Sequence, residues 1–518
     1  MSVEKFTSDI QNGYNFQGTS MLLGAAMING TAIPGLQVKA PLKTFNRHGL
    51  IAGATGTGKT KTLQHIAGEL AINGVSVLLM DIKGDLSGLA KPGTPNPKID
   101  ERAQKIGFNW QARAYSTELM TISDQDGVRL RATVSEFGPV LLSKILDLND
   151  VQQGVIALIF RFCDTYGLPL LDLKDFKKVL QYVTNEGKEE IEKEFGAVSP
   201  ATVGTILRKV IELETQGADA FFGETSFDVN DLLRKDENGY GYVNIIRLND
   251  IQDKPKLFST FMLSLLSEVY AKFPERGDVE IPELVIFIDE AHLVFNEASK
   301  ALLEQMEAII KLIRSKGVGI FFCTQNPIDI PDAILSQLGM KVQHALRAFT
   351  AKDREAIKKA AENYPVTEHY DIDEVLTVLG IGEAFVSVLN EKGIPTPLAQ
   401  TLMCPPASRM DIITDDEKRQ ILAASRLYAK YGQVVDRESA YEMLSQKMEA
   451  IAAQEAEAAE QKAAEKSLPK SGKQEKSTFE KVMGSTTTRQ IGRTVARELT
   501  RGLLGALGIG GKGKKGWF

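Results

Sequence analysis

Eight residues near the N-terminal end have the composition and spacing of a phosphate-binding loop. They fit the pattern G-x-x-x-x-G-K-[ST] and are Gly53, Ala54, Thr55, Gly56, Thr57, Gly58, Lys59 and Thr60. Glycine lets a backbone wrap a polyphosphate, and the N–H groups that open the next helix, from about Lys61, favour anions. The pattern predicts that Lys59 contacts the β- and γ-phosphates of ATP and that Thr60 ligates Mg²⁺, with Lys61 completing the nucleotide-binding segment. A Gly-rich turn with an incidental lysine is the alternative.

A second motif weighs against that alternative. Asp289 and Glu290 end an apolar run at 284–288, and we expect this run to be a strand beside the one that feeds the loop. Asp289 would then hold the Mg²⁺ and Glu290 would polarise the attacking water. Adjacent carboxylates at the end of a buried strand are costly without such a role; the alternative is an acidic strand end that only opens a loop. The letters D-E-A-H at 289–292 also match a helicase group, but the other motifs of that group are absent.

Two more polar residues follow apolar runs. Gln325 comes after the run 318–323 and is predicted to sense the γ-phosphate; its alternative is a turn residue before Asn326-Pro327. Asp81 ends the run 75–80. It either holds a water or a basic residue near the nucleotide, or it caps the turn that follows.

Arginine is the third component of many such sites, because it stabilises charge at the γ-phosphate and is often supplied by a neighbouring subunit. Arg314 follows the helix predicted after Glu290. Arg47, Arg347 and Arg354 are rival candidates, and for each of them solvation at a helix end is the alternative. The sequence does not choose among them.

Alternating strand and helix signals indicate how these residues are positioned. Strands are predicted at 50–52, 75–80, 242–248, 284–288, 318–323, 341–346 and 383–389, and long helices at 254–272 and 298–316. The alternation predicts an α/β fold with a doubly wound, mainly parallel sheet. We expect a short cap at 1–47, core segments at 48–133 and 236–410, a helical insertion at 134–235, C-terminal helices at 411–466, a linker at 467–483 and a basic tail at 484–518.

Bulk properties place limits on the type of protein. The 518 residues are 43% hydrophobic and carry a net charge of −6, which excludes a wholly basic nucleic-acid coat. Three separated cysteines suggest neither a disulfide framework nor a zinc site. No signal peptide or apolar run long enough to span a membrane is recognised, so we expect a cytoplasmic protein.

The ordered motifs together resemble the ring-forming HerA/FtsK group of P-loop ATPases. The likeness is closest to the HerA-like bacterial nucleoside-triphosphate hydrolases of a domain-of-unknown-function family. Its matching segments are 48–60, 78–86, 284–292, 312–319, 324–338 and 342–350. The resemblance implies a RecA-like motor that assembles as a hexamer around DNA, with Mg-ATP between subunits. It also implies that Glu290 is the catalytic base, Gln325 the sensor, Arg314 the arginine acting in trans and Arg47 a second arginine near the site.

The chain departs from that family at both ends. Members carry a sizeable N-terminal β-barrel that docks a nuclease, whereas only 1–47 precedes the first core strand here, so the nuclease partner is not carried over. In the tail, arginines recur every four residues from Arg489 to Arg501 beside an apolar stripe. This pattern fits a docked, solvated helix, or contact with nucleic acid, an anionic membrane surface or an acidic partner. A DNA motor is the leading hypothesis, and a nucleotide-gated assembly switch that does not act on DNA is the alternative.

Overall fold

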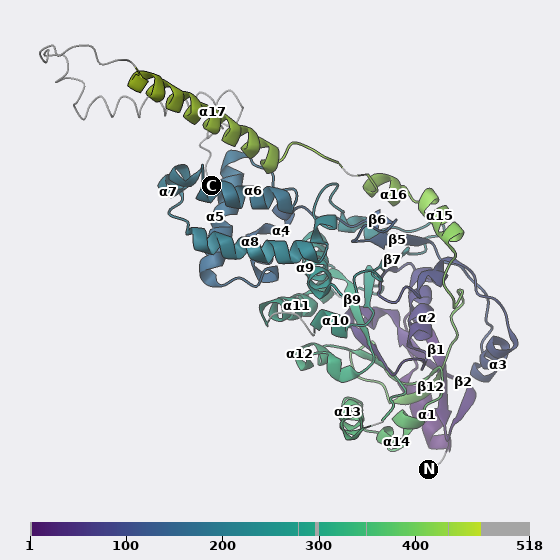
Figure 1. Ribbon diagram of the computed structural model, residues 1–518. Helices are drawn as coiled ribbons and strands as arrows, with labels where there is room; N and C mark the ends of the chain where they lie inside the picture. Colours follow the sequence, from purple (N-terminus) through teal and green to yellow (C-terminus); the bar gives the residue numbers. More distant parts are fainter. Residues whose placement is uncertain (1–2, 278, 296–299, 349, 434, 468–518) are drawn as a thin grey trace, which may run out of the picture. The chain divides into compact units, whose positions relative to one another are not determined.

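The computed structural model describes residues 3–277, 279–295, 300–348, 350–433 and 435–467 (Figure 1). The chain forms two compact units. The first contains residues 1–133, 144–147 and 211–435, and the second contains residues 134–143, 148–210 and 436 onward. The predicted linker, beyond its first residue, and the predicted basic tail at 484–518 lie outside the described residues.

A twelve-stranded sheet forms the centre of the first unit, in the order β2-β1-β12-β11-β10-β3-β9-β8-β4-β7-β5-β6. The strands are β1 Ser20–Ile28, β2 Thr31–Pro41, β3 Gly49–Ala52, β4 Ser76–Asp81, β5 Thr117–Thr121, β6 Val128–Arg129, β7 Val243–Arg247, β8 Leu284–Ile288, β9 Val318–Thr324, β10 Met340–His344, β11 Glu383–Ser387 and β12 Ala399–Met403. From β10 to β6 every neighbouring pair is parallel. From β10 out to β2 every pair is antiparallel.

The parallel strands are apolar because both faces of the sheet are covered. Along β8, Val285 and Phe287 belong to the same buried cluster as Leu63 and Ile66 of the helix α2, Lys59–Ile72. The alternate residues of β8 point to the other face and are also fully buried. Strands buried on two faces read as continuous apolar runs, which is why the sequence indicated them.

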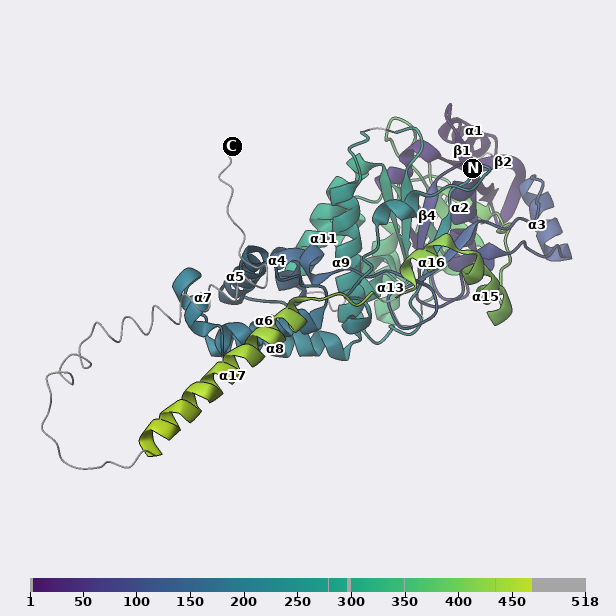
Figure 2. The same cartoon turned by 90° about the horizontal axis from the view of Figure 1, so that it is seen from above.

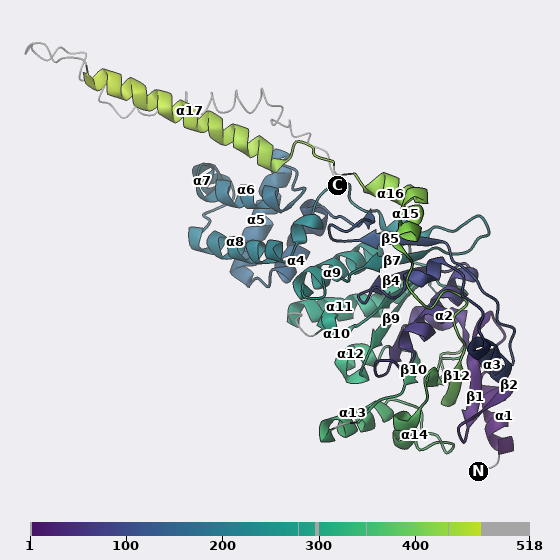
Figure 3. The same cartoon turned by 45° about the vertical axis from the view of Figure 1, so that its right-hand side comes forward.

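The antiparallel half contains the segment predicted as an N-terminal cap. Residues of β1 and β2 form a hairpin that joins the main sheet through β12, near the end of the first unit (Figure 3). Gly24 explains how closely β1 approaches β12, because a Cβ atom there would stand 2.1 Å from the Leu402 carbonyl oxygen. The hairpin therefore extends the sheet instead of preceding it.

The helices of the first unit are short except for α2, α9 and α11. They are α1 Val3–Gly13, α2, α3 Pro97–Ile106, α9 Pro255–Lys272, α10 His292–Phe295, α11 Lys300–Ile313, α12 Asp332–Leu335, α13 Ala351–Ala361, α14 Ile372–Val378, α15 Asp415–Ala424 and α16 Arg426–Tyr431. Among the described residues, no helix has the length and apolar content needed to cross a membrane.

The second unit is helical. Its elements are α4 Val134–Ile145, α5 Asp150–Tyr166, α6 Leu173–Thr184, α7 Lys188–Glu194, α8 Pro200–Thr215 and α17 Ala440–Ser467, and the unit boundaries fall inside α4 and α8. The long helix α17 packs on α6 (Figure 2). Its start is held by Asp175, whose carboxylate accepts hydrogen bonds from the Ser439 hydroxyl and the Tyr441 N–H. The insertion and the C-terminal helix thus share one core.

Candidate nucleotide site

The loop between β3 and α2 has the backbone that the glycines predict. Gly53, Gly56 and Gly58 adopt positive φ angles of 149°, 78° and 112°. A Cβ atom on Gly53 would stand 2.5 Å from Cβ of His344, and one on Gly58 would stand 3.1 Å from the Gly382 nitrogen. L-residues with side chains rarely adopt these φ values, so glycine is required on both steric and conformational grounds.

Neighbouring strands hold the loop in place. The Gly53 N–H donates to the Thr324 carbonyl at the end of β9, and the Ala54 N–H donates to the Ala345 carbonyl just after β10. Lys59 is 7% exposed, and its ammonium donates to the Gly53 carbonyl at 2.5 Å. The lysine head therefore lies inside the curve of the loop, where a phosphate chain would be bound. The loop fits the polyphosphate of a nucleotide.

Asp289 and Glu290 lie at the same edge of the sheet as the loop. They follow β8, and both are buried, at 7% and 5% exposed. One expectation is corrected here: the strand that carries them does not adjoin β3, because β9 lies between the two. Parallel strands end at a common edge, so the carboxylates still face the loop across the end of β9. Glu290 also has a φ of 45°, which is uncommon for a residue with a side chain.

The charged groups at this edge alter one another's ionisation. Burial raises the pKa of Asp289 to about 7, and the negative charge of Glu290 adds to this effect. Burial also lowers the pKa of Lys59, assisted by the nearby ammonium of Lys83. For Lys83, burial opposes the charged form, but its bond to Glu290 and the charge of Asp289 outweigh burial and raise the pKa. A divalent cation on Asp289 would favour the ionised carboxylate, so the acidic pair and Thr60 offer hard oxygen ligands suited to Mg²⁺.

Gln325 reaches the acidic pair. Its side-chain amide lies 3.5 Å from Oε2 of Glu290, and His292 Nδ1 lies 3.3 Å from the same oxygen. Gln325 directly follows β9, the strand between the loop and the carboxylates. The side chain thus occupies the position from which a γ-phosphate sensor would act.

Asp81 is fully buried, and both of its oxygens are used by its own turn. They accept N–H bonds from Gly84, Asp85 and Leu86 at 2.7, 3.1 and 3.0 Å. Burial raises the pKa of Asp81 to about 6. These bonds match the capping alternative. Their effect on the site is indirect, because the turn they hold carries Lys83.

The candidate arginines lie at different edges of the sheet. Arg314 follows α11 and Arg47 precedes β3, so both lie at the edge where the parallel strands begin, opposite the phosphate loop of their own chain. Arg347 and Arg354 follow β10, on the loop's edge, and the Arg347 guanidinium donates to the Thr377 carbonyl at 2.8 Å. Arg314 and Arg47 are therefore positioned away from their own site.

The sequence did not single out three residues that the structure brings to the site. Lys83 forms an ion pair with Glu290, His292 contacts the same carboxylate, and His344 packs under the loop. Lys83 and His292 lie within motifs already noted, but no spacing rule indicated their partner. His344 ends β10, a strand that mixes apolar and polar residues, so no local pattern could have identified it.

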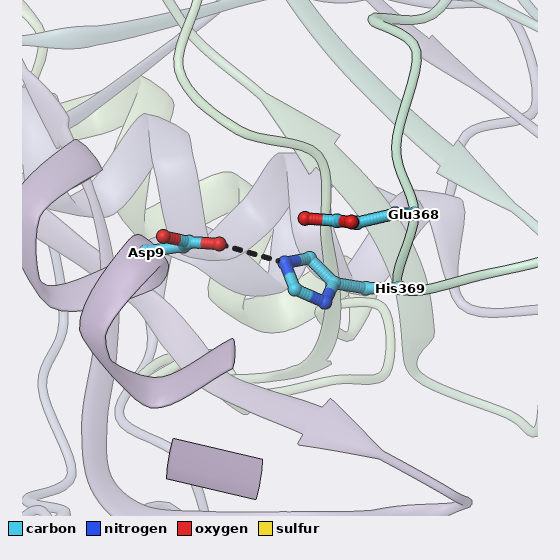
Figure 4. A group of neighbouring side chains, drawn as sticks. All are labelled: Asp9, Glu368 and His369. Carbon is cyan, nitrogen blue, oxygen red and sulfur yellow. Dashed lines mark hydrogen bonds and ion pairs between the residues drawn. The ribbon is translucent and has the colours of Figure 1, made fainter. Parts of the chain in front are cut away.

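A group of possible metal ligands lies elsewhere, at Asp9, Glu368 and His369 (Figure 4). His369 Nε2 lies 2.9 Å from Asp9, while Glu368 pairs with Lys5. The other ring nitrogen of His369 is buried without a partner. Imidazoles that bind metals normally donate their second N–H, which has no acceptor here. We assign the group a structural role, joining α1 to the segment before α14.

Comparison with known proteins identifies the family and relatives of this chain. The family model "Helicase HerA-like C-terminal" matches residues 28–514. The DNA double-strand break repair helicase HerA of Sulfolobus acidocaldarius is 22% identical over 367 residues, which are 70% of this chain and 66% of that protein. The protein of the same name from Sulfurisphaera tokodaii is 23% identical over 364 residues, 68% of this chain and 64% of that protein. The chain thus spans just under two thirds of the length of these relatives.

A solved structure confirms the fold. The bacterial conjugative coupling protein TrwB, in its unbound monoclinic form, aligns with a TM-score of 0.51 at 13% identity, covering 79% of this chain and 94% of that one. The predicted RecA-like P-loop fold, with its mainly parallel sheet and helical C-terminal region, is therefore correct. Because the family model covers nearly the whole length, the chain belongs to the helicase HerA-like C-terminal family.

Proposed function

We propose that this protein is a Mg²⁺-dependent ATP hydrolase that works as a HerA-like ring helicase or DNA translocase in the cytoplasm. The observation that carries the proposal is the meeting of three parts at one sheet edge. These are the left-handed glycine loop with Lys59 inside it, the acidic pair after β8, and Gln325 just after the intervening strand β9. Phosphate binding, metal binding and water activation require such a combination.

Each part has a distinct task in hydrolysis. The loop amides and Lys59 bind the β- and γ-phosphates, and Thr60 with Asp289 would hold Mg²⁺, which supplies charge neutralisation at the phosphates. Glu290 orients a water and accepts its proton, and Gln325 binds near the γ-phosphate. The two relatives above are named DNA double-strand break repair helicases, which supports DNA as the track.

The decisive assay measures phosphate release with and without double-stranded DNA. We expect hydrolysis that requires Mg²⁺, rises with DNA and falls at least about a hundredfold in Glu290→Gln. The same variant should still bind ATP, because its loop is unchanged. Slow hydrolysis indifferent to DNA would favour the assembly switch instead, and absence of ATP binding would reject both functions.

The position of Arg314 supports a homo-oligomer. We expect a hexamer, and measurement of the native mass tests this. Since Arg314 lies at the edge opposite its own loop, we propose that it serves the site of a neighbouring subunit, with Arg47 as a second arginine there. Mixing inactive Arg314→Ala and Glu290→Gln subunits tests this. An arginine acting in trans restores activity at mixed interfaces, whereas an arginine acting in cis leaves every mixture inactive.

A further inference from the structure

A turn after β4 holds Lys83 beside the carboxylate of Glu290. The turn follows β4, and Asp81 closes it by accepting three backbone N–H bonds. Its only long cationic side chain, Lys83, forms an ion pair with Oε1 of Glu290. The Lys83 side chain is 36% exposed, and that of Glu290 is 6% exposed. The ammonium thus reaches from a solvent-facing turn into the buried acidic site.

This ion pair determines what the Glu290 carboxylate can do. Oε1 is held by Lys83, while Oε2 lies near both Gln325 and His292. A general base needs a lone pair directed at the water that it activates. With Lys83 on one oxygen and two polar groups beside the other, the carboxylate is engaged by protein groups in this arrangement. A carboxylate has about four lone-pair directions, so these contacts do not exhaust it, but opening the Lys83 ion pair would free Oε1 for a water.

Lys83 is the contact that a bound triphosphate would compete for. The electrostatic influence of Lys83 on Lys59 shows that the two ammonium groups are close enough to interact. An outermost phosphate held by Lys59 would bring its negative charge to the same locality. Lysine has a flexible four-carbon stem and a full positive charge, so Lys83 can turn toward that phosphate, whereas the side-chain amide of Gln325 carries no charge.

We propose that Lys83 exchanges partners: it holds Glu290 until a triphosphate binds, then contacts the outermost phosphate and releases Glu290 to the water. This inference rests on the proposed ATP-binding function and adds a residue that distinguishes ATP from ADP. ADP lacks the outermost phosphate, so it leaves the Lys83–Glu290 pair intact. The exchange couples arrival of the correct nucleotide to release of the base.

A double-mutant cycle on binding tests the exchange without relying on turnover. The dissociation constants of a non-hydrolysable ATP analogue and of ADP are measured for the wild type, Lys83→Met, Glu290→Gln and the double variant. We expect Lys83→Met to weaken analogue binding about tenfold and to change ADP binding less than about twofold. Glu290→Gln should tighten analogue binding, because no ion pair must open, and that gain should vanish in the double variant.

Lys256→Met is the matched control. Lys256, on α9, is 38% exposed, close to the value for Lys83, but it pairs with Glu212 and not with the acidic pair. It should change neither dissociation constant. Equal weakening of both nucleotides by Lys83→Met, or a gain from Glu290→Gln that persists without Lys83, would overturn the exchange. A wild type that binds neither nucleotide would instead reject the proposed function itself.

Discussion

His344 provides a quantitative prediction about acid stability. The residue is fully buried beneath the phosphate loop. Its Nδ1 lies 2.9 Å from the Glu383 carbonyl oxygen, so this nitrogen carries the proton. Its Nε2 lies 3.0 Å from the Thr62 hydroxyl and accepts from it. Protonation of the ring would convert that acceptor into a donor and place a charge in the core.

Burial therefore lowers the pKa of His344 from 6.5 to about 4. The unfolded state binds the proton more readily, so the free energy of unfolding falls as pH drops below 6.5 and levels off below about 4. One pKa unit corresponds to about 1.36 kcal/mol, which gives a loss of about 3 kcal/mol in total and about 2.5 kcal/mol by about pH 4.5. Above pH 6.5 the ring costs no stability.

The variant His344→Gln isolates this contribution. Glutamine can donate to the carbonyl and accept from the hydroxyl, but it does not titrate. Urea unfolding is followed by the fluorescence of Trp110, which lies in the same unit, with Trp517→Phe present in both proteins. Other titrating groups, His48 included, cancel in the comparison. Between about pH 7 and pH 4.5 the wild type should lose about 2.5 kcal/mol relative to the variant. A difference in unfolding free energy that stays constant with pH would refute the reasoning.

Three further predictions concern the loop, the helical unit and the tail. Gly58→Ala should weaken binding of an ATP analogue at least about tenfold in calorimetric titration, because its φ of 112° is unfavourable for alanine; Gly154→Ala, in open space on α5, should have no effect. Asp175→Ala should destabilise the second unit by about 2–4 kcal/mol, because buried donors lose their acceptor, and should speed tryptic cleavage at Lys447 in α17. Removal of residues 484–518 should weaken DNA or liposome binding while leaving basal ATP hydrolysis intact, and unchanged binding to both at low salt would contradict it.

Much of the parallel sheet could be predicted because burial on both faces leaves a strong local signal. The runs predicted at 75–80, 284–288 and 318–323 coincide with β4, β8 and β9 to within about one residue. β12 could not be predicted in the same way. Its sequence, Ala399–Met403, mixes small and polar residues, and it forms a strand because β1 and β11 flank it. Partners so distant in sequence leave no local pattern.

The site shows the same division between local and tertiary information. The loop glycines and Lys59 were identifiable because a phosphate-binding loop requires these residue types at this spacing. The ion pair between Lys83 and Glu290 joins two segments that meet only when β4 pairs with β8. Likewise, Asp81 had two open roles in the sequence, and only its three backbone bonds show which one the turn uses.

The placement of β3 has a consequence for biosynthesis. This strand emerges early from the ribosome, yet its neighbours β9 and β10 are encoded far downstream. The hairpin of β1 and β2 likewise can join the main sheet only after β12 has been synthesised. At translation rates of roughly 5–20 residues per second, β3 stays unpaired for roughly 15–60 s. During that interval the nascent chain exposes an apolar strand with two bare edges, a substrate that chaperones recognise. Because the Ala54 N–H of the phosphate loop bonds to the Ala345 carbonyl just after β10, the loop gains its full set of backbone supports only once synthesis has passed β10.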